Sequence, residues 1–146
     1  MPSLTVSHVI IRLLLAAGCG AAIGLEREYH QKPAGLRTNI LIAMGAALFT
    51  ALSLQMAGEG GAADRIAANI ITGVGFLGGG AILRSGESVH GLTTAATIWV
   101  NAAIGMTAGV GAFSVAIAAT TITLVVLLIL PFIERWFENR PSNPRS

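Results

Sequence analysis

Charged residues are scarce in this sequence, and those present gather at a few places. Only 11% of the 146 residues are charged and 53% are hydrophobic, whereas a soluble domain carries about 25% charged residues. Long apolar stretches between charge clusters suit a bilayer, because a spanning helix needs about 20 predominantly apolar residues. We therefore expect residues 1–146 to form a single membrane domain, with no room for a soluble catalytic domain.

Cysteine, aromatic residues and clustered metal ligands are also nearly missing. Cys19 is the single cysteine, so no disulfide can form within the chain, and aromatic residues make up 5%. With no lysine-rich tract, this composition argues against nucleic acid as a partner. His8, His30 and His90 are isolated from one another, and no nucleophile stands with a base. We expect a protein that is not an enzyme and holds no metal and no cofactor.

Five apolar runs predict an all-α membrane protein with five transmembrane helices. The first run lacks the basic and cleavage regions of a signal peptide, so we expect it to remain as a helix. The last two runs meet at Gly109-Val110-Gly111, and together they are about twice a bilayer span, which predicts a tight hairpin turn. The predicted spans are Val9–Leu25, Thr38–Ala57, Ile66–Leu83, Leu92–Ala108 and Phe113–Ile133.

Basic residues predict the orientation of these spans. Seven of the nine Lys and Arg residues fall in the first loop, the third loop and the C-terminal tail, which lie on one side of a five-span arrangement. The other side has Arg65 and, just inside the first span, Arg12. An excess of basic residues marks cytoplasmic loops. This bias predicts an N-terminus outside and a C-terminus in the cytoplasm.

A faint internal repeat links the first and second halves of the domain. The second predicted helix opens with Gly35-Leu36-Arg37-Thr38, and the fourth opens with Gly91-Leu92-Thr93-Thr94. Helix pairs one–two and three–four would then be parallel repeats, an arrangement found in some transporters. Chance similarity between low-complexity apolar helices is the alternative.

Glycines recur at helical spacing and favour tight helix packing. Glycine costs about 1 kcal/mol relative to alanine in a helix, yet in lipid it lets two backbones approach closely. The alternative is an unwound segment that lines a pathway. The predicted packing glycines are Gly20, Gly24, Gly75, Gly78, Gly79 and Gly105.

Charged residues at the predicted membrane borders form two groups. On the inner side we expect Glu26, Arg27, Glu28, Arg37, Thr38 and Arg84 to gather as an ion-pair cluster, with a solvated network of little energetic weight as the alternative. On the outer side lie Arg12, Asp64 and Arg65. Arg12 stands one turn inside an apolar helix, where snorkelling and pairing with Asp64 would relieve its cost.

The fourth predicted helix carries Thr94, Thr97 and Asn101 on one face. Polar side chains in lipid turn inward and bond across helices. Hydrogen bonding between helices is therefore the favoured interpretation, and a polar lining for an ion or a partner helix is the alternative.

These residues give the chain a recognisable pattern, which resembles the MgtC/SapB family of bacterial inner-membrane proteins. The resemblance runs in order over about residues 12–112. It departs at Asn39, where many members have His, and at Thr93 and Val100, where some virulence-associated members have Asn and Cys. It rests on Arg12-Leu13-Leu14-Leu15-Ala16, Gly24-Leu25-Glu26-Arg27-Glu28, Pro33-Ala34-Gly35-Leu36-Arg37-Thr38, Asp64-Arg65-Ile66-Ala67, Gly73 to Ile82 and Gly91 to Trp99.

The resemblance implies a five-helix membrane domain and a role in adaptation to low magnesium and survival inside host cells. It also implies action through partners in the membrane, including the proton-translocating ATP synthase. Many members carry a further cytoplasmic C-terminal domain, which we do not expect here because the sequence stops at Ser146.

Two functions from different classes follow. The favoured one is a non-enzymatic inner-membrane protein, a homodimer or higher oligomer in the bilayer, that regulates membrane partners or energetics under ion stress. The alternative is a small oligomeric transporter or channel for an ion or metabolite.

The predicted orientation can be tested with topology reporters. A reporter fused after Ser146 should be cytoplasmic, and one inserted between Ala57 and Asp64 should be periplasmic, because the basic loops are retained inside. Alkaline phosphatase and green fluorescent protein fusions report the two compartments, and the opposite pair of results would reject the orientation.

Overall fold

The computed structural model describes residues 5–57, 63–86 and 88–138, and it is built from five helices. The all-α prediction is confirmed, and a helix forms in each of the five apolar runs, although α3 ends at Gly80 and the predicted end of that run, Leu83, lies in a strand. A short antiparallel hairpin between the third and fourth helices was not predicted. The elements are α1 (Val6–Tyr29), α2 (Leu36–Ala57), α3 (Ala63–Gly80), β1 (Leu83–Ser85), β2 (Ser88–His90), α4 (Leu92–Val110) and α5 (Phe113–Glu138).

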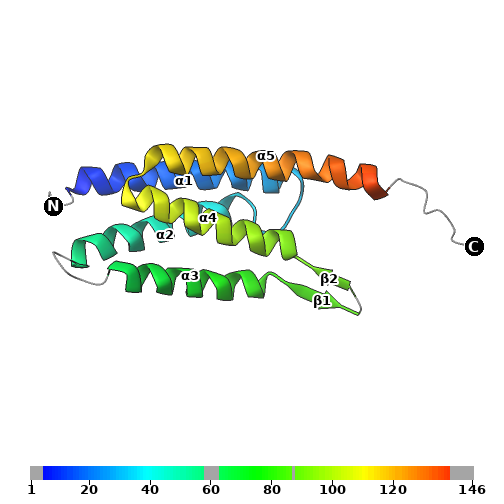
Figure 1. Ribbon diagram of the computed structural model, residues 1–146, viewed down its shortest axis with the longest axis horizontal. Helices are drawn as coiled ribbons and strands as arrows, with labels where there is room; N and C mark the ends of the chain where they lie inside the picture. The colour runs from blue at the N-terminus through cyan, green and yellow to red at the C-terminus, as the bar shows by residue number, and fades with distance from the viewer. Residues whose placement is uncertain (1–4, 58–62, 87, 139–146) are drawn as a thin grey trace, which may run out of the picture.

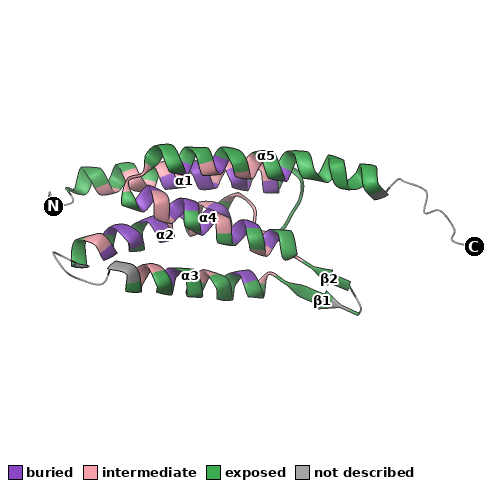
Figure 2. Cartoon of the chain, in the orientation of Figure 1, coloured by how far each residue is buried: buried purple, intermediate pink, exposed green. Residues whose placement is uncertain are grey.

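The helices form an elongated bundle in which α4 is the central element (Figure 1). Helix α4 packs against α1, α2, α3 and α5, whereas α3 lies at one edge and contacts only α2 and α4 closely. The hairpin of β1 and β2 extends from the end of the bundle where α4 begins. Buried residues concentrate on the facing sides of α1, α2 and α4 (Figure 2), so these three helices form the core.

Two pairs of glycines bring α1 and α4 against the backbone of α2, at successive positions along one face of that helix. A Cβ atom added at Gly20 would lie 2.6 Å from the Asn39 carbonyl oxygen, and one at Gly24 would lie 2.7 Å from the Leu36 Cα. Further along α2, an added Cβ at Gly109 would lie 2.5 Å from the Ala47 carbonyl oxygen, and one at Gly105 would overlap the carbonyl of Ala43. Each pair has the spacing i, i+4, which lets two helix backbones touch in lipid.

The glycines of α3 behave differently, and here the packing prediction was wrong in part. Gly78 is buried, with its added Cβ 3.5 Å from the carbonyl oxygen of Ala95. A Cβ added at Gly75 or Gly79 would meet nothing within 4 Å. Only one side of α3 faces the bundle. The helix contact predicted at Gly75 and Gly79 is therefore not made by any of the described residues.

A glycine turn joins α4 to α5, but it is shorter than the predicted Gly109-Val110-Gly111, because α4 continues to Val110. Gly111 ends α4 in the left-handed region with φ 95°, and its N–H donates to the Ala108 carbonyl. Residues with a side chain rarely adopt this conformation, which is typical of helix C-termini. Helix α5 then begins at Phe113 and runs back along α1.

Three of the described helices are long and apolar enough to cross a membrane, judged by length and composition. They are Val6–Tyr29, Leu36–Met56 and Phe113–Phe137. Helix α3 has 18 residues and α4 has 19, and neither is among these three. A multi-pass membrane protein is therefore supported, whereas five spans, their orientation and the repeat remain predictions.

We predict that Gly105→Val destabilises the bundle and that Gly79→Val does not. The first substitution forces α4 away from the α2 backbone, and overpacking of this kind costs about 1–3 kcal/mol. The second places its side chain in open space. Thermal unfolding of the purified variants in one neutral detergent would test the difference, and equal melting temperatures would refute the contact at Gly105.

Candidate functional site in the polar core

Two asparagines form a hydrogen-bonded pair at the centre of the bundle. Asn39 on α2 and Asn101 on α4 are both fully buried. The Asn101 Nδ2 donates to the Asn39 backbone oxygen at 2.7 Å and to the Asn39 Oδ1 at 3.1 Å. Asn39 in turn donates through its Nδ2 to the carbonyl of Gly35 at 3.0 Å, which ties the start of α2 to the preceding turn. The pair therefore joins α4 to the entry of α2.

Arg27 lies at the next level of the core, near the end of α1. Its side chain is only 5% exposed, and its Nη2 donates to the Thr94 Oγ1 at 3.2 Å. The Nη1 is 3.9 Å from the Glu26 Oε2, which is a long ion-pair distance. Among the described residues, the Arg27 Nε and the Glu26 Oε2 are buried without a hydrogen-bond partner. This arginine is thus incompletely satisfied by its own chain.

The polar face predicted for α4 points into the bundle. Thr94, Thr97 and Asn101 are all buried. Thr97 donates to the carbonyl of Thr93 at 2.7 Å, while Thr94 and Asn101 bond to α1 and α2. The Asn101 Oδ1 has no partner in the described part of the chain. Together with Arg27, Glu26 and Asn39, these side chains form what we call the polar core.

The remaining inner-side residues do not join the predicted cluster. Arg37 and Thr38 are exposed, and exposed Arg84 donates through its Nε to the carbonyl of Gly86 at 3.1 Å. Glu28 accepts from the Leu36 N–H at 3.0 Å. Within the described ranges no ion pair joins Arg37 or Arg84 to either glutamate, so this part of the prediction was wrong. These arginines share the end of the bundle with Glu26 but face other directions.

Glu26 has a neighbour that the sequence analysis did not select. The Nδ1 of His30 is 3.1 Å from the Glu26 Oε1, one helical turn further along α1. The same ring nitrogen also lies 3.0 Å from the Glu26 carbonyl oxygen. The i, i+4 spacing was the available signal for this contact.

On the opposite border, Arg12 binds a helix end. Its Nη1 donates to the Gly109 carbonyl oxygen at 2.7 Å, and its guanidinium lies over the Gly111 turn. A cation at a helix C-terminus is favourable because the carbonyl dipoles point toward it. The expected pairing with Asp64 cannot be followed, since the Asp64 side chain lies outside the described residues. Arg65 is exposed.

Comparison with known proteins gives the family. The sequence model of the MgtC family matches residues 13–136. The chain belongs to the MgtC family. Protein MgtC of Salmonella typhimurium strain LT2 is 49% identical over 121 residues, which cover 83% of this chain and 52% of that protein. No solved structure matches the chain.

Two other relatives of this MgtC-family chain are similarly close. The Escherichia coli K12 protein named "Putative magnesium transporter YhiD" is 50% identical over 128 residues, covering 83% of this chain and 60% of the relative. The uncharacterized protein slr0014 of Synechocystis is 42% identical over 134 residues, covering 92% and 57%. The chain thus spans a little over half the length of these relatives.

A double-mutant cycle should show that Asn39 and Asn101 stabilise the fold together. We predict that Asn39→Ala and Asn101→Ala each destabilise the protein by about 1–3 kcal/mol, because each leaves a buried polar group unpaired. The double variant should lose less than the sum, with a coupling of about 0.5–2 kcal/mol. Unfolding in mixed micelles gives these energies, and additive losses would show that the pair is not coupled.

Proposed function

We propose that this chain is a non-enzymatic protein of the bacterial inner membrane that regulates other membrane proteins or membrane energetics under low magnesium or ion stress. Membership of the MgtC family and a relative named for magnesium transport support a role connected with magnesium. The observation that carries the regulatory role is the open side of α3. This helix has only one side in the bundle and presents the rest to the lipid or to a partner.

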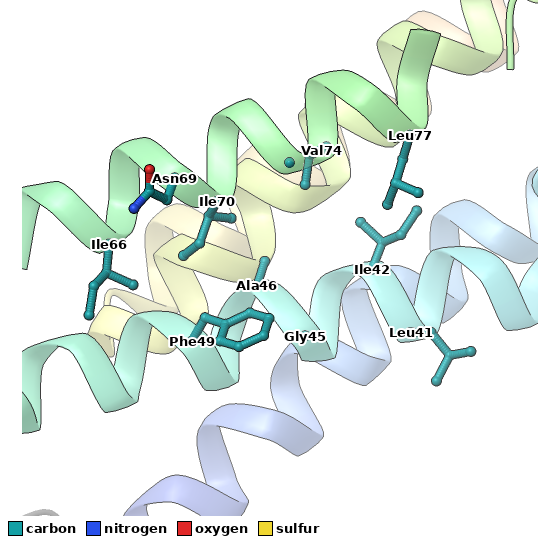
Figure 3. A pocket seen from close by; sticks show the side chains of 11 residues that line it. Leu41, Ile42, Gly45, Ala46, Phe49, Ile66, Asn69, Ile70, Val74 and Leu77 are labelled. Carbon is teal, nitrogen blue, oxygen red and sulfur yellow. The ribbon is translucent and has the colours of Figure 1, made fainter. Parts of the chain in front are cut away.

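A groove separates α3 from α2 along much of their length. It has a volume of about 650 Å³, and its walls are almost entirely apolar. Figure 3 shows Phe49 and Ile70 facing one another across it, with Leu77 toward one end and Asn69 at the rim. A groove of this shape suits the apolar side chains of a neighbouring transmembrane helix.

The face of α3 that is exposed outside the groove favours a second copy of the chain as one partner. Ala68, Thr72, Gly75 and Gly79 are exposed and follow the spacing 4, 3, 4, which places four small residues in one seam. Two copies inserted with the same orientation bring α3 together in parallel, with the same residues at the same depth. Asn69 lies beside the seam, and an amide in lipid is costly unless it is bonded.

A further partner is implied by the family resemblance. The proton-translocating ATP synthase is the partner suggested there, and regulation of it would link this protein to membrane energetics. Helix-to-helix binding through α3 provides a physical route to such regulation, because it needs no catalytic group.

Transport of an ion or metabolite is the second candidate, and the name of the relative YhiD favours it. The polar core supplies buried amide, hydroxyl and guanidinium groups between the helices. Against it, Asn39 and Asn101 bond to one another, and close glycine contacts bring the α2 backbone directly against α1 and α4. A conduit would therefore have to form between protomers.

We predict that Gly79→Leu abolishes complementation of a strain lacking its MgtC-family protein in low magnesium, while the protein stays folded. The bulky side chain blocks the α3 seam without touching the bundle. Gly18→Leu is the matched control, because Gly18 is also an exposed glycine with open space around it, on α1. Growth curves and expression levels measure the two variants.

Liposome flux separates the two functions. Wild-type protein reconstituted at several protein-to-lipid ratios should show no magnesium or proton flux above empty vesicles, with or without a membrane potential. Flux that grows with protein density, or full complementation by Gly79→Leu, would overturn the regulatory proposal.

A further inference from the structure

Helix α4 begins without a side-chain cap, and its backbone explains why. The N-cap residue Gly91 has φ 90°, and a Cβ there would overlap the carbonyl of Ala81. The residues that usually cap a helix, Ser, Thr, Asp and Asn, cannot occupy this position. The first intrahelical bond runs from the Ala95 N–H to the Gly91 carbonyl. The amides of Leu92, Thr93 and Thr94 therefore have no acceptor among the described residues.

The start of α2 shows which kind of group binds the free amides of a helix start in this protein. Both helices open with glycine, leucine, a variable residue and threonine. At α2, the carboxylate of Glu28 occupies this place, and its Oε2 accepts from the Leu36 N–H at 3.0 Å. In the described part of the chain no carboxylate takes the corresponding position at α4. An anionic oxygen is thus bound at the start of α2, and none of the described residues supplies one at the start of α4.

Arg27 supplies a second donor beside the start of α4. It bonds the hydroxyl of Thr94, which lies in the first turn of the helix. In a guanidinium group the Nε–H and one Nη2–H point out along the same edge, which fits two oxygens of a carboxylate or phosphate. Here the Nη2 is turned to Thr94, and the buried Nε is unpartnered. The free Nε–H therefore shares an edge of the guanidinium with the nitrogen that bonds Thr94.

The charges around the start of α4 favour a bound anion. Glu26 is the nearest carboxylate, and it lies beside the Nη1, at 3.9 Å, away from the Nε edge. His30 engages the other oxygen of Glu26. A 19-residue helix adds the equivalent of roughly half a positive charge at its N-terminus. Exposed Arg84 lies in the hairpin that leads into α4.

We propose that the N-terminus of α4 and the guanidinium of Arg27 form a binding site for a phosphate group. A phosphate can accept from the Nε edge and from first-turn amides at once, because its oxygens point in several directions. The group belongs either to an anionic lipid headgroup or to a free phosphate compound, since basic pockets between helices at a membrane border take both. The site is independent of the α3 partner surface, so either proposal can fail alone.

Binding to the purified full-length chain tests the site with two probes. The protein in neutral detergent is mixed with phosphatidylglycerol or phosphatidylcholine, and native mass spectrometry counts retained lipid. Inorganic phosphate is titrated separately and followed by ³¹P NMR. Wild type should retain phosphatidylglycerol over phosphatidylcholine if the source is lipid, and should bind inorganic phosphate if the source is free.

Arg27→Lys and Arg37→Lys are the matched variants. Lysine keeps the charge but has no Nε edge, so Arg27→Lys should weaken binding roughly tenfold or more. Arg37 is an exposed arginine at the same end, and its substitution should leave binding unchanged. Circular dichroism checks that both variants are folded, and Arg27→Gln replaces Arg27→Lys if the latter unfolds. Equal binding by wild type and the Arg27 variants, or binding of neither probe, would overturn the proposal.

Discussion

The close approach of α2 to two glycine pairs is the constraint on which the rest of the bundle depends. Because Gly20 and Gly24 carry no side chain, α1 reaches the α2 backbone at Leu36 and Asn39. Because Gly105 and Gly109 carry none, α4 reaches the same backbone at Ala43 and Ala47, further along α2. Three backbones at this distance exclude lipid between them. Polar side chains caught there must bond to each other, which is what Asn39 and Asn101 do.

The same constraint divides the protein into a closed part and an open part. Gly20 and Gly24 of α1 and Gly105 and Gly109 of α4 all face α2, and Arg12 bonds the far end of α4 to α1. Helix α3 packs on this unit through Ile70 and Val74 and through Gly78, whereas an added Cβ at Gly75 or Gly79 would meet nothing within 4 Å. Glycine lowers helix stability by about 1 kcal/mol relative to alanine, and no contact within the described chain offsets that cost at these two positions. A partner on that face would do so.

Sequence patterns predict the helices well, because apolar length and glycine turns are local properties. A helix formed in each of the five runs, and a turn formed at Gly111, although α3 ends before the predicted Leu83 and α4 continues to Val110. The pairing of Asn39 with Asn101 is not local, since 62 residues separate them. Equal glycine spacing likewise cannot say which pairs are buried: Gly20 with Gly24 and Gly75 with Gly79 look alike in sequence and differ in contacts. The β1–β2 hairpin escaped prediction because each strand has only three residues.

Arg27 and Arg37 show what decides whether a border charge has a specific role. Basic residues in sequence indicate the side of the membrane on which a loop lies, and both arginines belong to the same end of the bundle. Sequence does not indicate the direction in which each side chain points around its helix. Arg37 faces solvent, where its charge costs little and binds weakly. Arg27 is enclosed with a free donor and a distant carboxylate, and a buried charge left incompletely paired is expensive. A bound anion beside α4 would complete its pairing, so the burial of Arg27, more than its charge, makes it the functional candidate.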